Sequence, residues 1–147
     1  MRSQGFTLLE TLVVIAIIGI LMAVAWQSYL SYRDRARVDE AASSVGQLVS
    51  VATAHARKQS SVVTIRINPT TRLIQALSGT TTLYSQTLAL TSMTLTCRQA
   101  ACVTGSNTFT LQSPGGGFPD DLAFTLTSNG RSQTLKVIGP SAMVVYR

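Results

Sequence analysis

One carboxylate stands inside an otherwise apolar stretch near the start of the chain. Glu10 lies between Phe6 and Trp26, and from Leu12 to Trp26 no residue carries a charge. An ionised carboxylate in hydrocarbon costs about 2.5–3.5 kcal/mol on insertion scales, so a retained acid usually has a partner there. The position of Glu10 therefore predicts a partner for its carboxylate. The alternative is a side chain that reaches the membrane–water interface and has no role.

The other titratable side chains form no pattern typical of catalysis. His55 is the single histidine and falls on a predicted helix, where a solvated or interface position is expected. Asp120 and Asp121 are adjacent, and neighbouring residues of an extended chain point to opposite sides. Two carboxylates that point apart are poorly placed to act as a catalytic pair or to bind calcium together. The glycine-rich segment 113–117 lacks the G-x-x-x-x-G-K pattern of a phosphate-binding loop. We therefore expect no catalytic site, no metal and no cofactor.

The apolar stretch is long enough to cross a membrane. At about 1.5 Å per residue, a helix from Phe6 to Trp26 spans roughly 30 Å, the thickness of a bilayer core. Charged residues make up only 12% of the chain, well below the share usual in soluble proteins. A secretory signal has a shorter apolar region, followed by a small-x-small cleavage site. In this chain the apolar region is longer, and no clear cleavage site of that kind follows it. Basic residues on both sides, Arg2 before and Arg33 after, leave the orientation open.

The helix is predicted to continue beyond the apolar stretch to about Lys58. No proline occurs between Tyr29 and Lys58, and small or apolar residues recur at spacings of three and four, the pattern of one apolar helical face. These positions are Val38, Ala41, Val45, Leu48, Ala52 and Ala56. The rest of the surface is expected to be polar, at positions such as Arg37, Glu40, Ser44, Gln47 and Ser50. This half of the helix therefore has one face suited to covering another element.

After about Ser60 the hydrophobic pattern changes to that of short strands. The runs 62–67 and 73–77 flank a turn at 68–71 and are predicted to form a hairpin. Further strands are expected at Ser92–Cys97, Thr108–Gln112, Leu122–Thr127, Gln133–Ile138 and Ala142–Tyr146. Asn129-Gly130 between two of them is a strong hairpin signal. The predicted fold class is α+β, a long N-terminal helix whose amphipathic half packs on an antiparallel β-sheet domain.

The sequence GFTLLE, from Gly5 to Glu10, closely resembles the class III signal of type IV pilins and type II secretion pseudopilins. The match covers a short basic leader, the motif and the apolar stretch. In that family a prepilin peptidase cuts on the cytoplasmic side after the glycine, here Gly5, and methylates the new N-terminal amine, here that of Phe6. The family's glutamate, here Glu10, is considered to pair with that amine of a neighbouring subunit during filament assembly. The resemblance therefore implies that Glu10 is an assembly group.

The resemblance also implies an order of segments, a location and partners. We expect a cleaved leader at 1–5, a transmembrane and filament-core helix at 6–29, its amphipathic continuation at 30–60 and an antiparallel β domain at 61–147. The helix is expected to cross the inner membrane once, with the β domain outside the cytoplasm, before the subunit joins a pilus fibre at the cell surface or an assembly in the periplasm. The expected partners are other pilin or pseudopilin subunits, the prepilin peptidase and the inner-membrane assembly platform.

The two cysteines, Cys97 and Cys102, bound the short segment CRQAAC. A β domain outside the cytoplasm, as the resemblance implies, lies in an oxidising compartment, where a disulfide closing a small loop is expected. Two free thiols are the alternative. A zinc site is not expected, because it normally takes four ligands and no histidine is near the pair.

Basic residues exceed acidic ones, with a formal net charge of +6. This excess suits an anionic partner such as DNA, lipid head groups or an acidic protein face, or it is scattered over the surface. Some minor pilins of the FimT-like kind capture DNA, and Gly130-Arg131 with the terminal Arg147 loosely resembles their arginine-bearing end. The motif is incomplete, because no second arginine follows nearby. The candidate DNA-binding residues are Arg131, Lys136 and Arg147, which would contact phosphates with little base preference.

The function that these observations favour is that of a minor pilin, a structural subunit of a type IV pilus that supports assembly, adhesion, motility or DNA uptake. The many short strands resemble the GspH/FimT-like branch. The absence of a proline before Pro69 departs from many major pilins. A type II secretion pseudopilin of the GspH type and a DNA-binding minor pilin for natural transformation are the alternatives. A membrane-anchored enzyme lacks any constellation of residues to support it.

Overall fold

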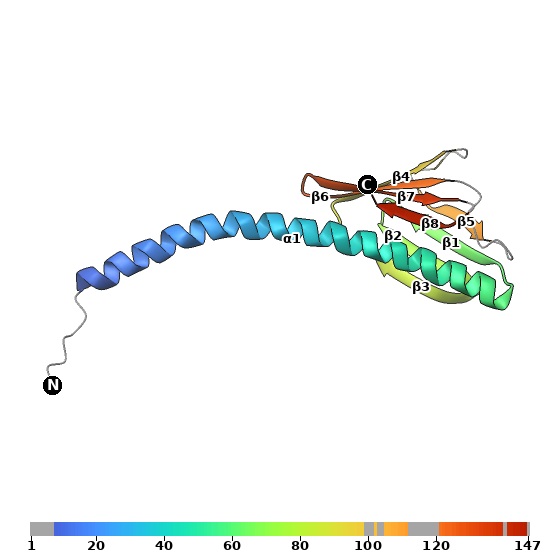
Figure 1. Ribbon diagram of the computed structural model, residues 1–147, viewed down its shortest axis with the longest axis horizontal. Coiled ribbons are helices and arrows are strands. Elements are labelled where there is room, and N and C mark those ends of the chain that lie inside the picture. Colours follow the sequence, from blue (N-terminus) through green and yellow to red (C-terminus); the bar gives the residue numbers. More distant parts are fainter. Residues whose placement is uncertain (1–7, 99–101, 103–104, 112–120, 140, 147) are drawn as a thin grey trace, which may run out of the picture. The chain divides into compact units, whose positions relative to one another are not determined.

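The computed structural model describes residues 8–98, 102, 105–111, 121–139 and 141–146, and Figure 1 shows its helix and strands. Within these residues one long helix is followed by eight short strands. The chain divides into two compact units, Met1–Asp34 and Arg35–Arg147. The first unit contains the apolar part of the helix, and the second contains the rest of the helix and every described strand.

Helix α1 extends from Leu8 to Gln59, and no proline falls within it. Arg57 and Lys58 lie in the last turn, where positive charge is favourable beside the negative end of the helix dipole. Ser60 then adopts a positive φ of 48°, a left-handed conformation typical of the residue that ends a helix. The end expected at about Lys58 agrees with the structure.

The strands of the second unit form two four-stranded antiparallel sheets within the described residues. The first sheet has the order β3-β2-β1-β5, formed by Thr81–Thr87, Leu73–Ser78, Val63–Asn68 and Asn107–Leu111. The second has the order β4-β6-β7-β8, formed by Ser92–Cys97, Leu122–Ser128, Arg131–Ile138 and Met143–Tyr146. Most neighbouring strands are consecutive in sequence. The exception in each sheet arises because the chain passes to the second sheet for β4 and returns to the first for β5.

Two tight turns have the residues that their geometry requires. At the β6–β7 turn, Asn129 and Gly130 have φ angles of 47° and 82°, as expected for a two-residue hairpin of type I′. At the β1–β2 turn, the backbone N–H of Thr71 donates to Asn68 Oδ1 at 3.1 Å, which is the usual role of an asparagine in a turn. The hairpins predicted at both places are confirmed.

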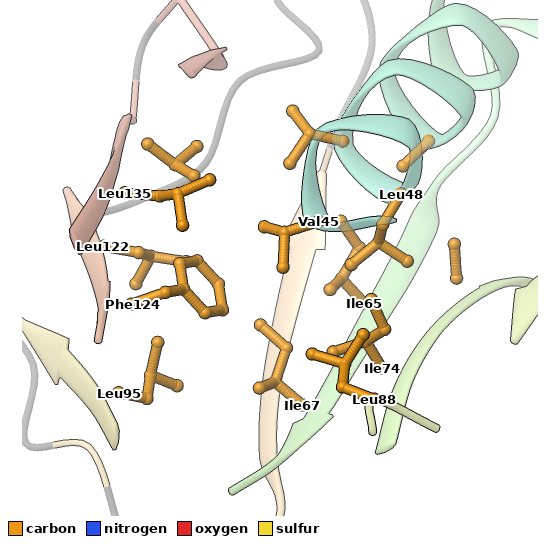
Figure 2. Packing of buried hydrophobic residues seen from close by; sticks show 14 of the residues in the cluster. Val45, Leu48, Ile65, Ile67, Ile74, Leu88, Leu95, Leu122, Phe124 and Leu135 are labelled. Atoms are coloured by element: carbon orange, nitrogen blue, oxygen red, sulfur yellow. The ribbon is translucent and has the colours of Figure 1, made fainter. Parts of the chain in front are cut away.

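The hydrophobic core lies between the amphipathic half of α1 and the inner faces of both sheets (Figure 2). Strands β1 and β6 alternate buried and less buried residues, as expected when one face of a strand is covered. Figure 2 shows Val45 and Leu48 of the helix beside Ile65 of the first sheet, with Phe124 and Leu135 of the second sheet opposite. All the helix positions predicted to be apolar and covered are at most 4% exposed, so the amphipathic pattern is confirmed.

Gly46 permits a close approach between the helix and the C-terminal strand. A Cβ atom placed on Gly46 would lie 3.0 Å from the Tyr146 hydroxyl oxygen, closer than about nine in ten real contacts of a Cβ atom. Tyr146 is the last residue of β8, which pairs with β7 at the edge of the second sheet. The glycine therefore leaves room for this tyrosine beside the helix.

Ser44 is a correction to the helix prediction. It was expected on the polar surface but is only 5% exposed. The Ser44 hydroxyl donates a hydrogen bond to the Glu40 carbonyl, one helical turn earlier, at 2.9 Å. The buried hydroxyl therefore has a hydrogen-bond partner without water. A small side chain that bonds to its own helix can thus occupy the buried face.

Strand β3 is absent from the sequence prediction. Its sequence, TTLYSQT, is rich in polar residues, and its burial alternates only weakly because it forms an edge of the first sheet. The strand predicted from Thr108 begins one residue earlier, at Asn107, and Gln112 lies outside the described residues. The buried strands were therefore easier to recognise than the exposed one.

Candidate functional site

The first unit contains a helical segment, from Leu8 to Trp26, whose large apolar side chains are all exposed. From Leu8 to Trp26 each of them is at least 44% exposed, and Leu8 reaches 83%. The most apolar 18-residue window has a mean hydropathy of 2.7, and none of it is buried. By length and composition this helix is able to cross a membrane. Burying one such side chain contributes about 1.5–3 kcal/mol, so this surface is suited to cover by lipid or by other protein chains.

Glu10 lies on this exposed helix, in the first turn of its described part. Its apolar neighbours Leu9 and Leu12 are 73% and 62% exposed. The helix dipole places partial positive charge near this end, which favours a carboxylate. The cleavage site at Gly5 and Phe6 lies outside the described residues. Cleavage, methylation and the assembly role of Glu10 therefore stay predictions.

Three exposed aromatic side chains lie at the end of the apolar stretch and just after it. Trp26, Tyr29 and Tyr32 are 67%, 59% and 72% exposed. Such rings gather at membrane–water interfaces, where their apolar bodies and polar tips suit the headgroup level. Arg33 and Asp34 come next, with Arg33 Nη2 4.0 Å from Asp34 Oδ1. The change in composition is visible in the sequence and marks the end of the segment suited to hydrocarbon.

In the second unit, Cys97 and Cys102 form a disulfide, with their Cα atoms 5.5 Å apart. Cys97 is the last residue of β4, in the second sheet. The bridge predicted between the two cysteines is therefore present, and the described part of the chain contains no free cysteine.

Asp121 joins several strand ends beside this bridge. Its Oδ2 accepts a hydrogen bond from Arg98 Nη1 at 3.1 Å, and its Oδ1 accepts one from the Gly139 backbone N–H at 2.8 Å. These bonds connect the ends of β4, β6 and β7, which gives Asp121 a structural role. Asp120 lies outside the described residues. Among the residues that the structure describes, no group of three His, Cys, Asp or Glu side chains is placed to hold a metal.

The candidate DNA-binding residues do not share one face of the second sheet. Arg131 and Lys136 are both exposed on β7, but their odd spacing places the two side chains on opposite sides of the strand. Lys136 belongs to the outer side, since its neighbours Leu135 and Val137 are buried. Arg147 lies outside the described residues. Of the three candidates, the structure thus describes only Arg131 and Lys136 and places them on opposite faces of β7.

Other polar side chains of the second unit serve internal contacts. Arg72 Nη1 donates to the Leu90 carbonyl at 2.7 Å, which fastens the start of β2 to the segment that leads to the second sheet. Arg98 is held by the Asp121 carboxylate. His55 Nδ1 is 3.5 Å from Ser61 Oγ, between the last turns of the helix and the start of β1. Arg72 and Arg98 are thus engaged in contacts within the second unit.

Comparisons with known proteins agree with these features. Residues 1–26 match the family described as the prokaryotic N-terminal methylation motif. The chain is 32% identical over 118 residues to the type IV narrow pilus major component PilA5 of Thermus thermophilus, a match that covers 78% of this chain and 91% of PilA5. It is 58% identical over 39 residues to the type IV major pilin protein PilE1 of Neisseria gonorrhoeae, which covers 26% of this chain and 24% of PilE1.

A solved structure with a similar fold is the type IV minor pilin FimU of Pseudomonas aeruginosa. It aligns with a TM-score of 0.59 and covers 79% of this chain and 92% of FimU. At 14% sequence identity, this likeness concerns the fold alone, a long N-terminal helix packed on antiparallel sheets. The similarity to PilA5 is closer and extends over nearly the whole of that protein. On this basis the chain belongs to the type IV pilin family.

Proposed function

We propose that this chain is a minor subunit of a type IV pilus, inserted in the inner membrane and polymerised through its N-terminal helix. The observation that carries the proposal is a helix that exposes every large apolar side chain from Leu8 to Trp26 and has one acid, Glu10, among them. Before assembly a bilayer covers this surface. In the fibre the helices of neighbouring subunits cover it instead.

The assembly role is assigned to Glu10 together with the N-terminal amine of Phe6. Cleavage after Gly5 by a prepilin peptidase creates this amine, which is then methylated. A carboxylate deep in the bilayer costs about 2.5–3.5 kcal/mol, and a cation from an adjacent subunit offsets this cost when the two charges meet away from water. A subunit that docks with its amine beside the Glu10 of its neighbour is therefore favoured over one that does not.

The proposed topology places the β domain outside the cytoplasm, first at the periplasmic side of the inner membrane and then on the fibre. The disulfide between Cys97 and Cys102 supports this placement, because such bridges persist in oxidising compartments and are rare in the cytosol. The partners proposed with it are other pilin subunits and the inner-membrane assembly platform.

Two observations support a minor rather than a major subunit. The fold resembles that of FimU, which is a minor pilin, and the chain has no proline before Pro69, unlike many major pilins. PilA5 is named a major component. The amount of this subunit in the fibre is therefore the quantity that separates the two roles.

A pilus is proposed over a type II secretion system because the relatives PilA5 and PilE1 are pilins. A GspH-type pseudopilin would share the cleavage motif, the helix and the fold. DNA binding through the C-terminal region is the weaker alternative, because the side chains of Arg131 and Lys136 project from opposite faces of β7.

The test is mass spectrometry of fibres sheared from the native host. The proposal predicts a peptide that begins at methylated Phe6, present in the fibres at a small fraction of the most abundant pilin. An amount equal to that of the most abundant pilin would contradict the minor role. A processed peptide found only in the cell envelope, with sheared pili made of other subunits, would favour the pseudopilin. An uncut N-terminus would contradict pilin processing.

A further inference from the structure

A polar groove lies between the first turns of the second unit's helix and the β6–β7 hairpin. It is lined by Arg35, Val38 and Asp39 of α1 and by residues 130–133 of the hairpin. Its volume is about 450 Å³, within the range of roughly 300–1,000 Å³ typical of small-molecule sites. All its lining residues belong to the same compact unit. We name it the Arg35–Arg131 groove.

The groove combines two cations, one anion and one buried acceptor. Arg35, Arg131 and Asp39 are exposed residues of its lining. Gln133 Oε1 is buried and has no hydrogen-bond donor among the described residues. A buried acceptor without a donor is rare in folded proteins, so it points to a group that the polypeptide does not supply. Within the described part of the chain, neither Arg35 nor Asp39 takes part in an ion pair, so both are open to an external group.

These groups match a ligand that carries a phosphate and a primary ammonium. Arginine side chains bind phosphate oxygens through paired N–H donors in a planar fork. A primary ammonium has three N–H donors, which suit the Asp39 carboxylate and Gln133 Oε1. We infer that the Arg35–Arg131 groove binds the phosphoethanolamine headgroup of a membrane phospholipid.

The short distance in sequence between the apolar stretch and Arg35 of the groove favours a lipid over a soluble phosphate compound. Arg35 follows Trp26, the last residue of the apolar stretch, by nine positions, and nine residues of chain reach at most about 30 Å. The exposed rings of Tyr29 and Tyr32 lie in this segment, and such rings are enriched at the headgroup level. The covalent chain therefore keeps the groove near a membrane surface while the apolar helix is in the bilayer, a condition that rests on the proposed function.

The size of the groove favours a headgroup over a protein partner. A stable protein interface buries about 800 Å² on each side. The groove has the volume of a small-molecule site, and its polar groups come from only a few positions on the helix and the hairpin. A single phosphoethanolamine headgroup carries a phosphate for arginine donors and an ammonium for the carboxylate and the buried amide oxygen.

The inference is tested with the full-length chain purified in detergent and observed by native mass spectrometry. Dioleoylphosphatidylethanolamine and dioleoylphosphatidylcholine are added in separate titrations. The two lipids share the phosphate, but choline has no N–H donor for Asp39 or Gln133. We expect the chain to retain the ethanolamine lipid about tenfold better than the choline lipid, because choline cannot donate the charge-assisted hydrogen bonds. Equal retention of the two lipids would overturn the inference.

Three variants locate the binding. Arg131→Gln and Asp39→Asn should lower the retention of the ethanolamine lipid to that of the choline lipid. Arg66→Gln is the matched control, because Arg66 is an exposed cation on β1 and does not line the groove. Circular dichroism checks that each variant is folded. A loss of retention that is equal in Arg66→Gln and Arg131→Gln would contradict a specific site.

Two further measurements separate the lipid from other occupants. If inorganic phosphate or free phosphoethanolamine displaces the lipid at equal concentration, the ligand is a soluble phosphate compound and the lipid assignment is wrong. Incorporation into sheared fibres is measured in parallel for every variant. If Arg131→Gln leaves lipid retention intact but lowers incorporation, the groove binds a neighbouring subunit and the inference is overturned. A wild-type chain that selects the ethanolamine lipid but never enters a fibre would support the inference and contradict only the pilus function.

Discussion

The two parts of helix α1 differ in what covers their apolar side chains. From Leu8 to Trp26, every large apolar side chain is at least 44% exposed, whereas Val45, Ala52 and Ala56 in the later part have no exposed surface. The later part covers a core to which both sheets of its own unit contribute. One helix therefore carries a surface for folding and a surface for lipid or other subunits. Mutations in the two parts should change different measurements.

Exchange of leucine for alanine in each part gives the largest expected contrast. Leu48 is 1% exposed and Leu12 is 62% exposed. Leu48→Ala removes buried methyl groups and leaves a cavity, which should lower the free energy of unfolding by about 2–5 kcal/mol. Leu12→Ala should change it by no more than about 0.5 kcal/mol. Denaturant unfolding of the full-length chain in detergent measures both values, and similar losses would contradict the division of the helix.

Removal of the disulfide has the next largest expected effect. Cys97 and Cys102 are separated by 5 positions, and closing so short a loop restricts the unfolded chain by about 2 kcal/mol. Replacing both cysteines by serine should lower the free energy of unfolding of the second unit by about that amount. The amount of protein in the membrane fraction should stay unchanged, because the bridge is far in sequence from the apolar helix. A loss from the membrane would show that the two units depend on each other.

A smaller contrast is expected at the strand ends around Asp121. Asp121→Ala removes the acceptor for both Gly139 and Arg98, and the lost hydrogen bonds should lower stability by about 1–2 kcal/mol. Arg98→Gln removes only an ion pair whose arginine side chain is 76% exposed, so about 0–1 kcal/mol is expected. The same unfolding experiment compares the two variants. Equal losses in the two variants would contradict a contribution from the hydrogen bond between Gly139 and Asp121.

Periodic burial explains which elements could be predicted from the sequence. A helix or strand covered on one face repeats its apolar residues at 3.6 or 2 positions, and the buried face from Val38 to Ala56 and the strand Ser92–Cys97 follow these patterns. Strand β3 lies at a sheet edge and has few covered side chains, so its sequence carries little of this signal. Ser44 was placed on the wrong side because its bond to a helix carbonyl is invisible in a hydrophobicity pattern.

The site was predictable only where its chemistry is local in sequence. The two cysteines of the disulfide lie within a few residues of each other, whereas the assembly role of Glu10 stays a prediction. The bonds of Asp121 to Arg98 and Gly139, in contrast, connect residues that only the folded sheet brings together. The same is true of the Arg35–Arg131 groove. The separation of Arg131 and Lys136 to opposite faces could have been found by counting along the predicted strand.

The most direct test of assembly through the exposed part of the helix compares Glu10→Gln with Glu40→Gln. Each exchange removes one negative charge from α1 with little change in shape, but Glu10 lies in the apolar part and Glu40 is an exposed residue of the later part. Both variants should reach the membrane and be processed like the wild type. The amount of Glu10→Gln in sheared fibres should fall about tenfold or more, because the neighbour's amine loses its partner in an apolar environment, a cost above the roughly 1.4 kcal/mol that corresponds to tenfold. Glu40→Gln should enter fibres normally, and equal incorporation of the two variants would contradict the role assigned to Glu10.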